Sequence, residues 1–222
     1  MARLIAVANL KGGCGKSTIA VNLACELAQK TTVKLIDADA QGTTTAWGGQ
    51  GGLPVQVTSL PLDGLNGAET WMRQVLDIEA DYVVIDCPPH VGNATQAAVG
   101  IADLVLVPVT ASGADIIATT GALDLVGQAR IVRKGDGPDC LMVPSRIDRR
   151  TSAGREIEKA LKSFGEAISP AVCQRTAFVD AFSAGQWIGE YEPKGKAYDE
   201  IKALSRAVAK RKGKRQHGQK AA

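Results

Sequence analysis

Hydrophobic residues in this chain form short continuous runs, and longer stretches with a helical spacing of apolar positions lie between them. Short apolar runs that end in a polar residue or a proline are typical of strands buried on both faces of a sheet. The predicted strands are Leu4–Ala8, Val33–Asp37, Tyr82–Asp86, Leu104–Pro108, Leu141–Pro144 and a further one near Ala171–Cys173. The predicted helices are Lys16–Gln29, Gly67–Ile78, Thr95–Ile101, Ile116–Val132, Ser152–Phe164, Ala177–Ala184 and Ala197–Lys210.

Strands that alternate with helices of this length predict an α/β fold, a doubly wound and mostly parallel sheet with helices on both faces. Aromatic residues make up only 4% of the chain, so smaller aliphatic residues must fill the core, which disfavours a small β-sandwich. We expect a single domain over residues 1–209 and a basic, disordered tail over residues 210–222. The glycine-rich segment Gly48–Gly52 is predicted to be a mobile surface loop.

Composition argues against several classes of protein. No apolar run approaches the roughly 20 residues that a membrane-spanning helix needs, and the first residues carry no cleavage-site pattern, so a cytoplasmic protein is expected. The five cysteines show no C-x-x-C pair, which argues against disulfides and zinc sites. His90 and His217 lie beside Pro, Gly or basic residues, so no Ser-His-Asp or Cys-His hydrolase site is expected.

The net charge of +3 is distributed unevenly along the chain. The first 201 residues contain 18 basic and 23 acidic side chains, whereas the last 21 contain eight basic and no acidic ones. The tail is therefore the part of the chain that is expected to bind an anionic partner.

The strongest chemical signal is the segment over residues 9–18, which reads NLKGGCGKST and joins a predicted strand to a predicted helix. This is a P-loop in the structural context that the motif requires. Its glycines allow a tight turn with the N–H groups pointing inward, and the start of the helix adds the positive end of its dipole. The segment therefore predicts a site for a polyphosphate.

Two side chains of this loop have distinct expected roles. Lys16 is expected to reach the β- and γ-phosphates, and Ser17 to place its hydroxyl on Mg²⁺. The general motif has glycine where this chain has Leu10.

Carboxylates follow two further predicted strands. Asp37 and Asp39 close the second strand, and Asp86 closes the third. Ligands of an open parallel sheet lie outside the carboxyl ends of its strands, so all three acids are expected beside the P-loop. An apolar strand that ends in an Asp is the usual metal-side element of a P-loop NTPase.

These motifs carry a family resemblance. The segments KGGCGKST from Lys11, DADAQG from Asp37 and IDCPP from Ile85 resemble the deviant Walker A ATPases of the ParA/MinD group. The match is similar most of all to the short ParA-type partition ATPases without an N-terminal helix-turn-helix domain. It covers nearly the whole chain, because VPVT at 107–110 and the segment from Arg175 to Leu204 follow the order of the family.

The resemblance implies a set of site residues. Lys11 would cross a nucleotide-sandwiched homodimer interface to touch the partner's ATP, and Asp39 would orient or activate the attacking water. Asp37 and Asp86 would support Mg²⁺ together with Ser17, and residues 86–92 would form a switch that senses the γ-phosphate. The catalytic set is Lys11, Lys16 and Asp39, and the ATP-binding set is Lys11, Gly12, Gly13, Cys14, Gly15, Lys16, Ser17 and Thr18. The family usually has Pro where this chain has Ala40, which implies a looser switch.

The function implied is a Mg²⁺-dependent ATPase of weak basal activity that dimerises on ATP and binds DNA non-specifically on the nucleoid. A ParB-like or cargo-adaptor partner would stimulate hydrolysis, and the cargo would be a plasmid, a chromosome or another assembly. The DNA-binding candidates are Arg175, Lys210, Arg211, Lys212, Lys214 and Arg215, since basic side chains at phosphates give salt-dependent, sequence-independent affinity. Arg146, Arg149 and Arg150 are candidates to flank the base.

Other functions stay open at this stage. The same fold could act as a nucleotide-dependent regulator or scaffold on a secretion, cellulose or chemotaxis apparatus. A MinD-like membrane role is not expected, because no bulky apolar residue follows Ile201, Leu204 and Val208 before the basic run. Cys14 at a helix start could be a redox-sensitive thiol. A nitrogenase-reductase-like role would need cluster-ligating cysteines, which the spread positions do not provide.

Overall fold

The computed structural model describes residues 1–62, 64 and 67–211. The strands are β1 (Arg3–Val7), β2 (Val33–Asp37), β3 (Gln56–Ser59), β4 (Tyr82–Asp86), β5 (Leu104–Val109), β6 (Asp139–Ile147), β7 (Ala167–Ile168) and β8 (Val172–Cys173). The helices are α1 (Lys16–Leu27), α2 (Thr43–Gly48), α3 (Ala68–Leu76), α4 (Asn93–Ile101), α5 (Gly113–Val132), α6 (Ser152–Leu161), η1 (Lys162–Phe164), α7 (Thr176–Ser183), α8 (Ile188–Tyr191) and α9 (Lys196–Lys210).

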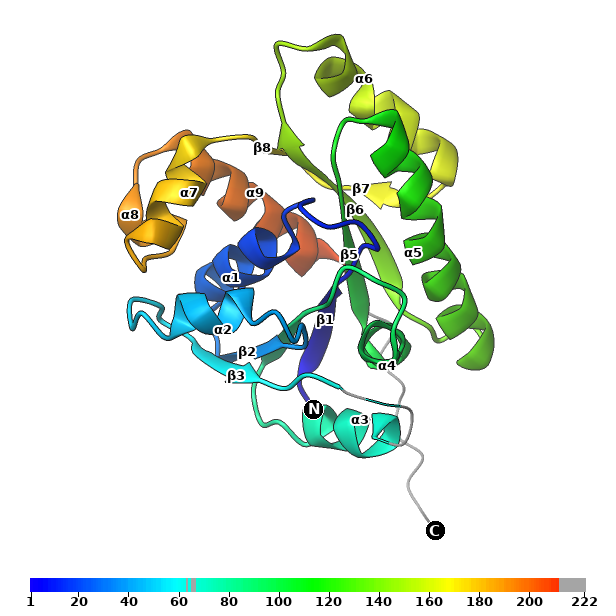
Figure 1. Ribbon diagram of the computed structural model, residues 1–222. Coiled ribbons are helices and arrows are strands. Elements are labelled where there is room, and N and C mark those ends of the chain that lie inside the picture. The colour runs from blue at the N-terminus through cyan, green and yellow to red at the C-terminus, as the bar shows by residue number, and fades with distance from the viewer. Residues whose placement is uncertain (63, 65–66, 212–222) are drawn as a thin grey trace.

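One sheet runs through the molecule with helices on both sides (Figure 1). Its strand order is β3-β2-β4-β1-β5-β6-β7, with β8 paired to β6, and the strand pairs are parallel. The chain winds outward from β1 in both directions, which is the doubly wound arrangement. The predicted fold class is confirmed.

Two apolar cores fill the space between the sheet and its helices. Helices α3 to α6 close one core, and α1, α2, α7, α8 and α9 close the other. Alternate residues of each central strand serve the two cores: on β5, Val105 and Val107 face one, and Leu104 and Leu106 face the other. A strand covered on both faces has no solvent side, which explains the continuous apolar runs.

The register of the central strands brings three loops to one edge of the sheet. The last residue of β1, Val7, pairs with Asp86 of β4, and Asp86 pairs in turn with Asp37 of β2. The loops that follow these strands therefore start side by side. The P-loop and the three predicted acids therefore lie at this edge, Asp37 and Asp86 as the last residues of their strands and Asp39 in the loop after β2.

Four elements escaped prediction. β3 and β7 are short edge strands, and the side chains of β3 are mostly exposed, so they lack an apolar run. α2 reads TTTAWG and α8 has only four residues, so neither shows a helical period. Each is held by tertiary contacts rather than by its own pattern.

The segment Gly48–Gly52 is anchored at both of its ends, and the residues between them are exposed. Gly48 is the last residue of α2, and Gly52 forms an isolated parallel bridge with Gln186. A side chain at Gly52 would collide with the backbone carbonyl of Gly185. Glycine is needed at position 52 for a close backbone approach, which composition alone could not distinguish from flexibility.

Helix α9 is part of the core. Ile201, Leu204 and Val208 are fully buried in the cluster that also contains α1. Its apolar face is therefore not available to a bilayer. Within the described residues, no helix is long and apolar enough to cross a membrane.

The end of α9 is fixed at the edge of the sheet where the strands begin. Arg211 donates two hydrogen bonds to Asp139, the first residue of β6, at 2.6 and 2.5 Å. Arg3, the first residue of β1, donates to the carbonyls of Val208 and Arg211. The tail predicted to begin at Lys210 thus starts inside the fold, and residues 212–222 lie outside the described residues.

Candidate nucleotide site

The P-loop is built as the motif requires. Gly13 and Gly15 have φ values of 75° and 91°, a left-handed conformation that favours glycine. A Cβ on Gly15 would lie 2.7 Å from the Ser145 hydroxyl oxygen, so space excludes a side chain as well. Helix α1 starts directly after Gly15 without a side-chain cap, which leaves the N–H groups of its first turn for an anion.

The start of the loop is anchored from both sides. Asn9 is buried, its amide donates to the Pro108 carbonyl at 2.6 Å, and its side-chain oxygen accepts from the N–H of Lys11. Leu10, which departs from the general motif, packs into the core next to Gly121 of α5. The departure therefore fixes the loop to a neighbouring helix.

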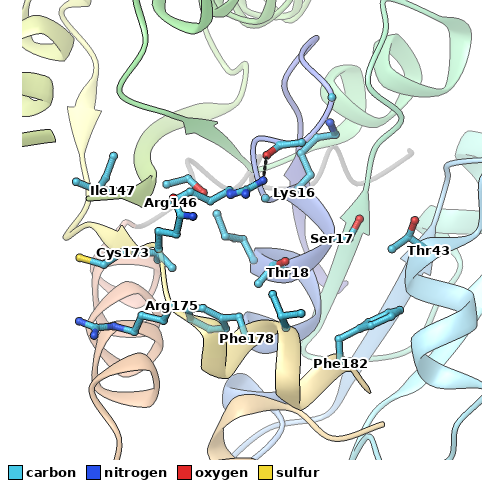
Figure 2. A pocket seen from close by; sticks show the side chains of 18 of the residues that line it. Lys16, Ser17, Thr18, Thr43, Arg146, Ile147, Cys173, Arg175, Phe178 and Phe182 are labelled. Atoms are coloured by element: carbon cyan, nitrogen blue, oxygen red, sulfur yellow. Dashed lines mark hydrogen bonds between the residues drawn. The ribbon is translucent and has the colours of Figure 1, made fainter. Parts of the chain in front are cut away.

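A cavity of about 1040 Å³ opens in front of the P-loop. Figure 2 shows Lys16, Ser17 and Thr18 on one wall and Phe178 and Phe182 of α7 on another. The Lys16 ammonium, which is almost buried, donates to the backbone carbonyl of Lys11 at 2.9 Å, so it lies along the loop. The cavity therefore has polar P-loop side chains on one wall and apolar side chains on another, a composition that suits a nucleotide.

The two acids after β2 have different surroundings. Asp37 is buried and both of its oxygens are used: one accepts from the N–H of Asp39, the other from the N–H and hydroxyl of Thr45 at 2.7 and 2.8 Å. Asp39 is half-buried, accepts from the N–H of Gln41 and lines the cavity. Asp37 therefore positions α2, whereas Asp39 faces the space that a ligand would fill.

Helix α2 is held at its other end by Trp47. The indole N–H donates to the Gln186 carbonyl at 3.0 Å, and the ring meets Phe182 edge-on with centroids 5.0 Å apart. Trp47 is 2% exposed and also lines the cavity. The loop that carries Asp39 is thus connected to α7.

Asp86 is a buried carboxylate with only one satisfied oxygen. Its Oδ2 accepts from the Thr44 hydroxyl at 2.7 Å, while its Oδ1 has no hydrogen-bond partner among the described residues. Burial raises the pKa of Asp86 to about 6, with Asp37 adding to the rise and the Thr44 and Ser17 hydroxyls opposing it. Such a group is costly unless a ligand compensates it.

These residues fit Mg²⁺. The unpartnered Asp86 oxygen and the Ser17 hydroxyl provide hard oxygen donors on one side of the phosphate loop, and Mg²⁺ is usually bound by one or two protein oxygens, water and phosphate oxygens. Asp37, whose oxygens are already bonded, fits an indirect role better than direct coordination.

Lys11 makes an ion pair that the sequence did not predict. Its ammonium contacts the carboxylate of Asp115, in the first turn of α5. Burial raises the pKa of Asp115, but hydrogen bonds from Lys11, Thr110 and Ser112 outweigh it and leave the pKa lowered. Lys11 is 43% exposed, so the pair can be reached from outside the subunit.

Cys14 does not have the environment of a reactive thiolate. It is buried, and its thiol donates to the Lys11 carbonyl at 3.2 Å. Burial raises the pKa of Cys14 by more than the nearby Lys16 lowers it. The raised pKa argues against the hypothesis that Cys14 is a redox-sensitive thiol.

The three arginines at the end of β6 and in the loop after it have different surroundings. Arg146 crosses to the P-loop and donates to the Gly13 carbonyl at 2.7 Å (Figure 2). Arg150 pairs with Asp148, which holds the pKa of that carboxyl at about 2. Arg149 lines the cavity beside Cys173.

The predicted DNA-binding residues do not form one cluster. Arg175 lines the cavity, yet its guanidinium points to α9 and binds Glu200 at 2.6 Å, and Arg211 binds Asp139. Lys210 is exposed at the end of α9. Lys212, Lys214 and Arg215 lie outside the described residues.

Sequence reasoning missed the partners of the predicted residues. The main ones are the hydroxyls of Thr44 and Thr45 and the carboxylates of Asp115 and Glu200. The run of three threonines after the Asp37–Gln41 motif was a signal for hydroxyl donors near the acids. Nothing in the sequence linked Asp115 or Glu200 to its arginine or lysine partner.

Fold and site together define a P-loop nucleotide-binding protein. A family model described as the CobQ/CobB/MinD/ParA nucleotide binding domain matches residues 5–213. The chain belongs to this family, and within it to the ParA/MinD-type ATPases.

Named relatives cover nearly the whole chain. The Maintenance of carboxysome distribution protein A of Halothiobacillus neapolitanus is 30% identical over 92% of this chain and 95% of its own length. The Chromosome-partitioning ATPase Soj of Thermus thermophilus is 31% identical over 94% and 96%.

Solved structures share the fold. The Cyanothece McdA(D38A)–ATP complex has a TM-score of 0.75 at 20% identity, with 94% and 96% of the two chains covered. The MinD of Pyrococcus horikoshii complexed with Mg-ADP has a TM-score of 0.74 at 17% identity, with 95% and 97% covered.

The substitution Asp86→Asn should stabilise the empty protein and weaken Mg²⁺-dependent nucleotide binding. The folded carboxyl keeps its proton up to about pH 6, whereas the ordinary value is 3.8, so wild-type stability falls as the pH rises through this window. At neutral pH the neutral amide should add up to about 3 kcal/mol to the free energy of unfolding. Urea unfolding without ligand at neutral and acidic pH measures this, and the advantage of the variant should shrink in acid.

The matched control is Asp37→Asn. Both oxygens of Asp37 already accept hydrogen bonds, from the N–H of Asp39 and from the N–H and hydroxyl of Thr45. An amide has only one acceptor oxygen, so at least one of these donors should lose its partner, and the protein should be destabilised. Equal effects of the two substitutions would contradict the assignment of Asp86 as the unsatisfied group.

Proposed function

We propose that this protein is an ATP-driven positioning enzyme that dimerises around ATP and binds DNA non-specifically. Hydrolysis, stimulated by a ParB-like or cargo-adaptor partner, would release it from DNA. The observation that carries the proposal is the meeting of Lys16, Ser17 and Asp39 around one cavity in front of the P-loop. The names of the relatives, which refer to carboxysome distribution and chromosome partitioning, support a positioning role.

Each residue has a physical role in phosphoryl transfer. The α1 N–H groups and Lys16 bind the β- and γ-phosphates, which stabilises charge that moves toward the leaving oxygen. Ser17 and Asp86 would hold Mg²⁺, which would neutralise phosphate charge. Asp39 orients a water for attack on the γ-phosphorus; the bond to the β–γ bridging oxygen breaks, ADP leaves, and the proton of the water passes to the released phosphate through or beside Asp39.

Dimerisation would complete the site. Lys11 belongs to the P-loop, and its ammonium is held by Asp115 of its own chain. A second subunit's ATP is a stronger anionic partner than one carboxylate, so ATP in a facing subunit can draw Lys11 away from Asp115. Because hydrolysis requires both this exchange and an activator, the protein should hydrolyse ATP slowly by itself.

DNA binding is assigned to the tail rather than to the folded arginines. Arg175 and Arg211 each have a carboxylate partner, so their positive charges are partly cancelled and attract DNA phosphates less strongly. Lys210 and the basic residues beyond Arg211 have positive charge in sequence without acids nearby. Affinity from these residues would be electrostatic and would fall steeply with salt.

A scaffold that acts on a non-DNA apparatus is the second candidate. The pairing of Arg175 with Glu200 and of Arg211 with Asp139 favours it, because the folded surface then offers fewer uncompensated cations to a duplex. A nucleotide-dependent DNA co-sedimentation experiment distinguishes the two candidates.

Lys16→Ala should reduce ATP hydrolysis by more than about tenfold, because a charged group that binds the transferred phosphoryl is removed. Removal of Mg²⁺ with a chelator should have a comparable effect on the wild type. Phosphate release measures both. Lys30→Ala, in the exposed turn after α1, is the control and should match the wild type. Unchanged hydrolysis by Lys16→Ala would refute the phosphate site.

Three substitutions test the dimer. Asp39→Ala should trap an ATP dimer by slowing hydrolysis, and Lys11→Ala should leave a monomer. Asp115→Asn frees the half-exposed Lys11 ammonium from its ion pair with the largely buried Asp115, so dimerisation should occur at about two- to fivefold lower protein concentration. Light scattering over a concentration series with ATP measures all three. Monomers of wild type and Asp39→Ala alike would exclude the sandwich.

Truncation after Arg211 should weaken DNA binding and reduce its salt dependence, while the bond to Asp139 stays intact. Removal of the basic residues beyond Arg211 should lower the slope of log affinity against log salt by up to about 0.9 for each phosphate that these residues neutralise. Mobility-shift titrations at several salt concentrations, with ATP, ADP and no nucleotide, measure this. If the truncated chain bound DNA as tightly as the wild type, the tail would not be part of the DNA interface.

Arg175 needs a charge-swap control. Arg175→Glu places a like charge against Glu200, so weaker DNA binding could come from a disturbed junction between α7 and α9. The double variant Arg175→Glu, Glu200→Arg restores the pair. If Arg175 contacts phosphate, the double variant should regain the stability of the wild type but not its affinity for DNA.

A further inference from the structure

We propose that Arg146 is a positioning residue for the phosphates: its guanidinium fixes the Gly13 carbonyl outside the P-loop and adds a positive charge at the cradle. This rests on the proposed nucleotide function and names a further residue of the same site. The sequence had placed Arg146 beside the base, whereas its contact lies on the P-loop.

The backbone at Arg146 is specialised for this contact. Its φ is 53°, and among the described residues only Lys134 shares a positive φ without being glycine. The pairing of β6 with β8 is irregular at this point: Ser145 pairs with Val172 and Ile147 with Cys173. A bulged residue in a strained conformation is typical of a position that directs a side chain at a functional site.

The side chain lies along the glycines of the loop. Its Nη1 donates to the Gly13 carbonyl at 2.7 Å, and its Cγ lies 3.8 Å from the position a Cβ would take on Gly15. Figure 2 shows the Arg146 side chain reaching from the end of its strand to the loop beside Lys16. A Cβ at Gly13 or Gly15 would lie in ordinary contact with Arg146, so these glycines are required by their positive φ and, at Gly15, by the closeness of the Ser145 hydroxyl.

The contact has two consequences for an anion. A carbonyl that accepts from Arg146 is held with its oxygen away from the phosphate space, so the loop is prepared for an anion before one binds. Among the described residues Arg146 has no acidic partner, unlike Arg150 and Arg175, so its charge is not cancelled locally. A guanidinium has five N–H donors, and four remain beyond the one that binds Gly13.

The proposal makes the phosphates, not the base, the ligand part that Arg146 supports. Removal of its side chain should therefore weaken binding of inorganic tripolyphosphate and of ATP to the same degree, about tenfold for one charged hydrogen bond. Hydrolysis at saturating ATP should be largely retained, so that KM rises and kcat does not fall in proportion.

The experiment compares Arg146→Ala, Arg146→Gly and Arg146→Lys by calorimetric titration with tripolyphosphate and with ATP. Ala and Gly should both lose affinity, and Lys, which keeps the charge and one donor, should recover most of it. Gly should also raise the melting temperature of the empty protein above that of Ala, since glycine adopts the positive φ without strain. A merely structural role would instead lower the melting temperature and the affinity together.

Arg149→Ala is the matched control, because Arg149 lines the same cavity without a hydrogen bond to the P-loop. Its tripolyphosphate affinity should change less than about twofold. Wild-type affinity in Arg146→Ala, or a loss for ATP alone, would overturn the proposal. Wild-type protein that bound neither ligand would instead refute the proposed function, and Lys16→Ala provides the reference for a disabled phosphate site.

Discussion

The start of α1 is the point on which the rest of the site depends. Its first-turn N–H groups have no side-chain cap, and the loop before it can turn only because Gly13 and Gly15 take a left-handed conformation. Uncapped N–H groups attract negative charge, and the same edge of the sheet presents the negative charge of Asp86 with one oxygen unpaired among the residues that the structure describes. The fold thus holds separate donors and acceptors that a magnesium–nucleotide complex would satisfy together.

The sequence predicted most of what lies inside the sheet and little of what surrounds the site. The strands Val33–Asp37 and Tyr82–Asp86 were predicted with their observed bounds, because burial on both faces leaves a continuous apolar run that stops at a charged residue. α2 and the edge strand β3 were missed, since polar threonines and exposed positions carry no such pattern.

The roles of single side chains were harder to predict than their locations. That Asp37 and Asp86 meet follows from parallel register. That one is fully bonded and the other is not depends on which threonine of α2 reaches which carboxylate. Trp47, in the same short helix, anchors α2 to the Gln186 carbonyl. Arg175 and Arg211 looked free in sequence, yet Glu200 and Asp139, distant in the chain, neutralise them.

Trp47 provides the protein with an internal optical probe. Its indole lies against Phe182 and donates to the Gln186 carbonyl, at the end of the helix whose first turn holds Asp37 and Asp86. The chain has three tryptophans, and Trp71 and Trp187 lie in α3 and directly before α8, outside the loop that follows β2. A shift of α2 would change the polarity around Trp47 first. Emission from this indole would therefore report the rearrangement of the loop in the unlabelled protein, on the timescale of a stopped-flow mixing experiment.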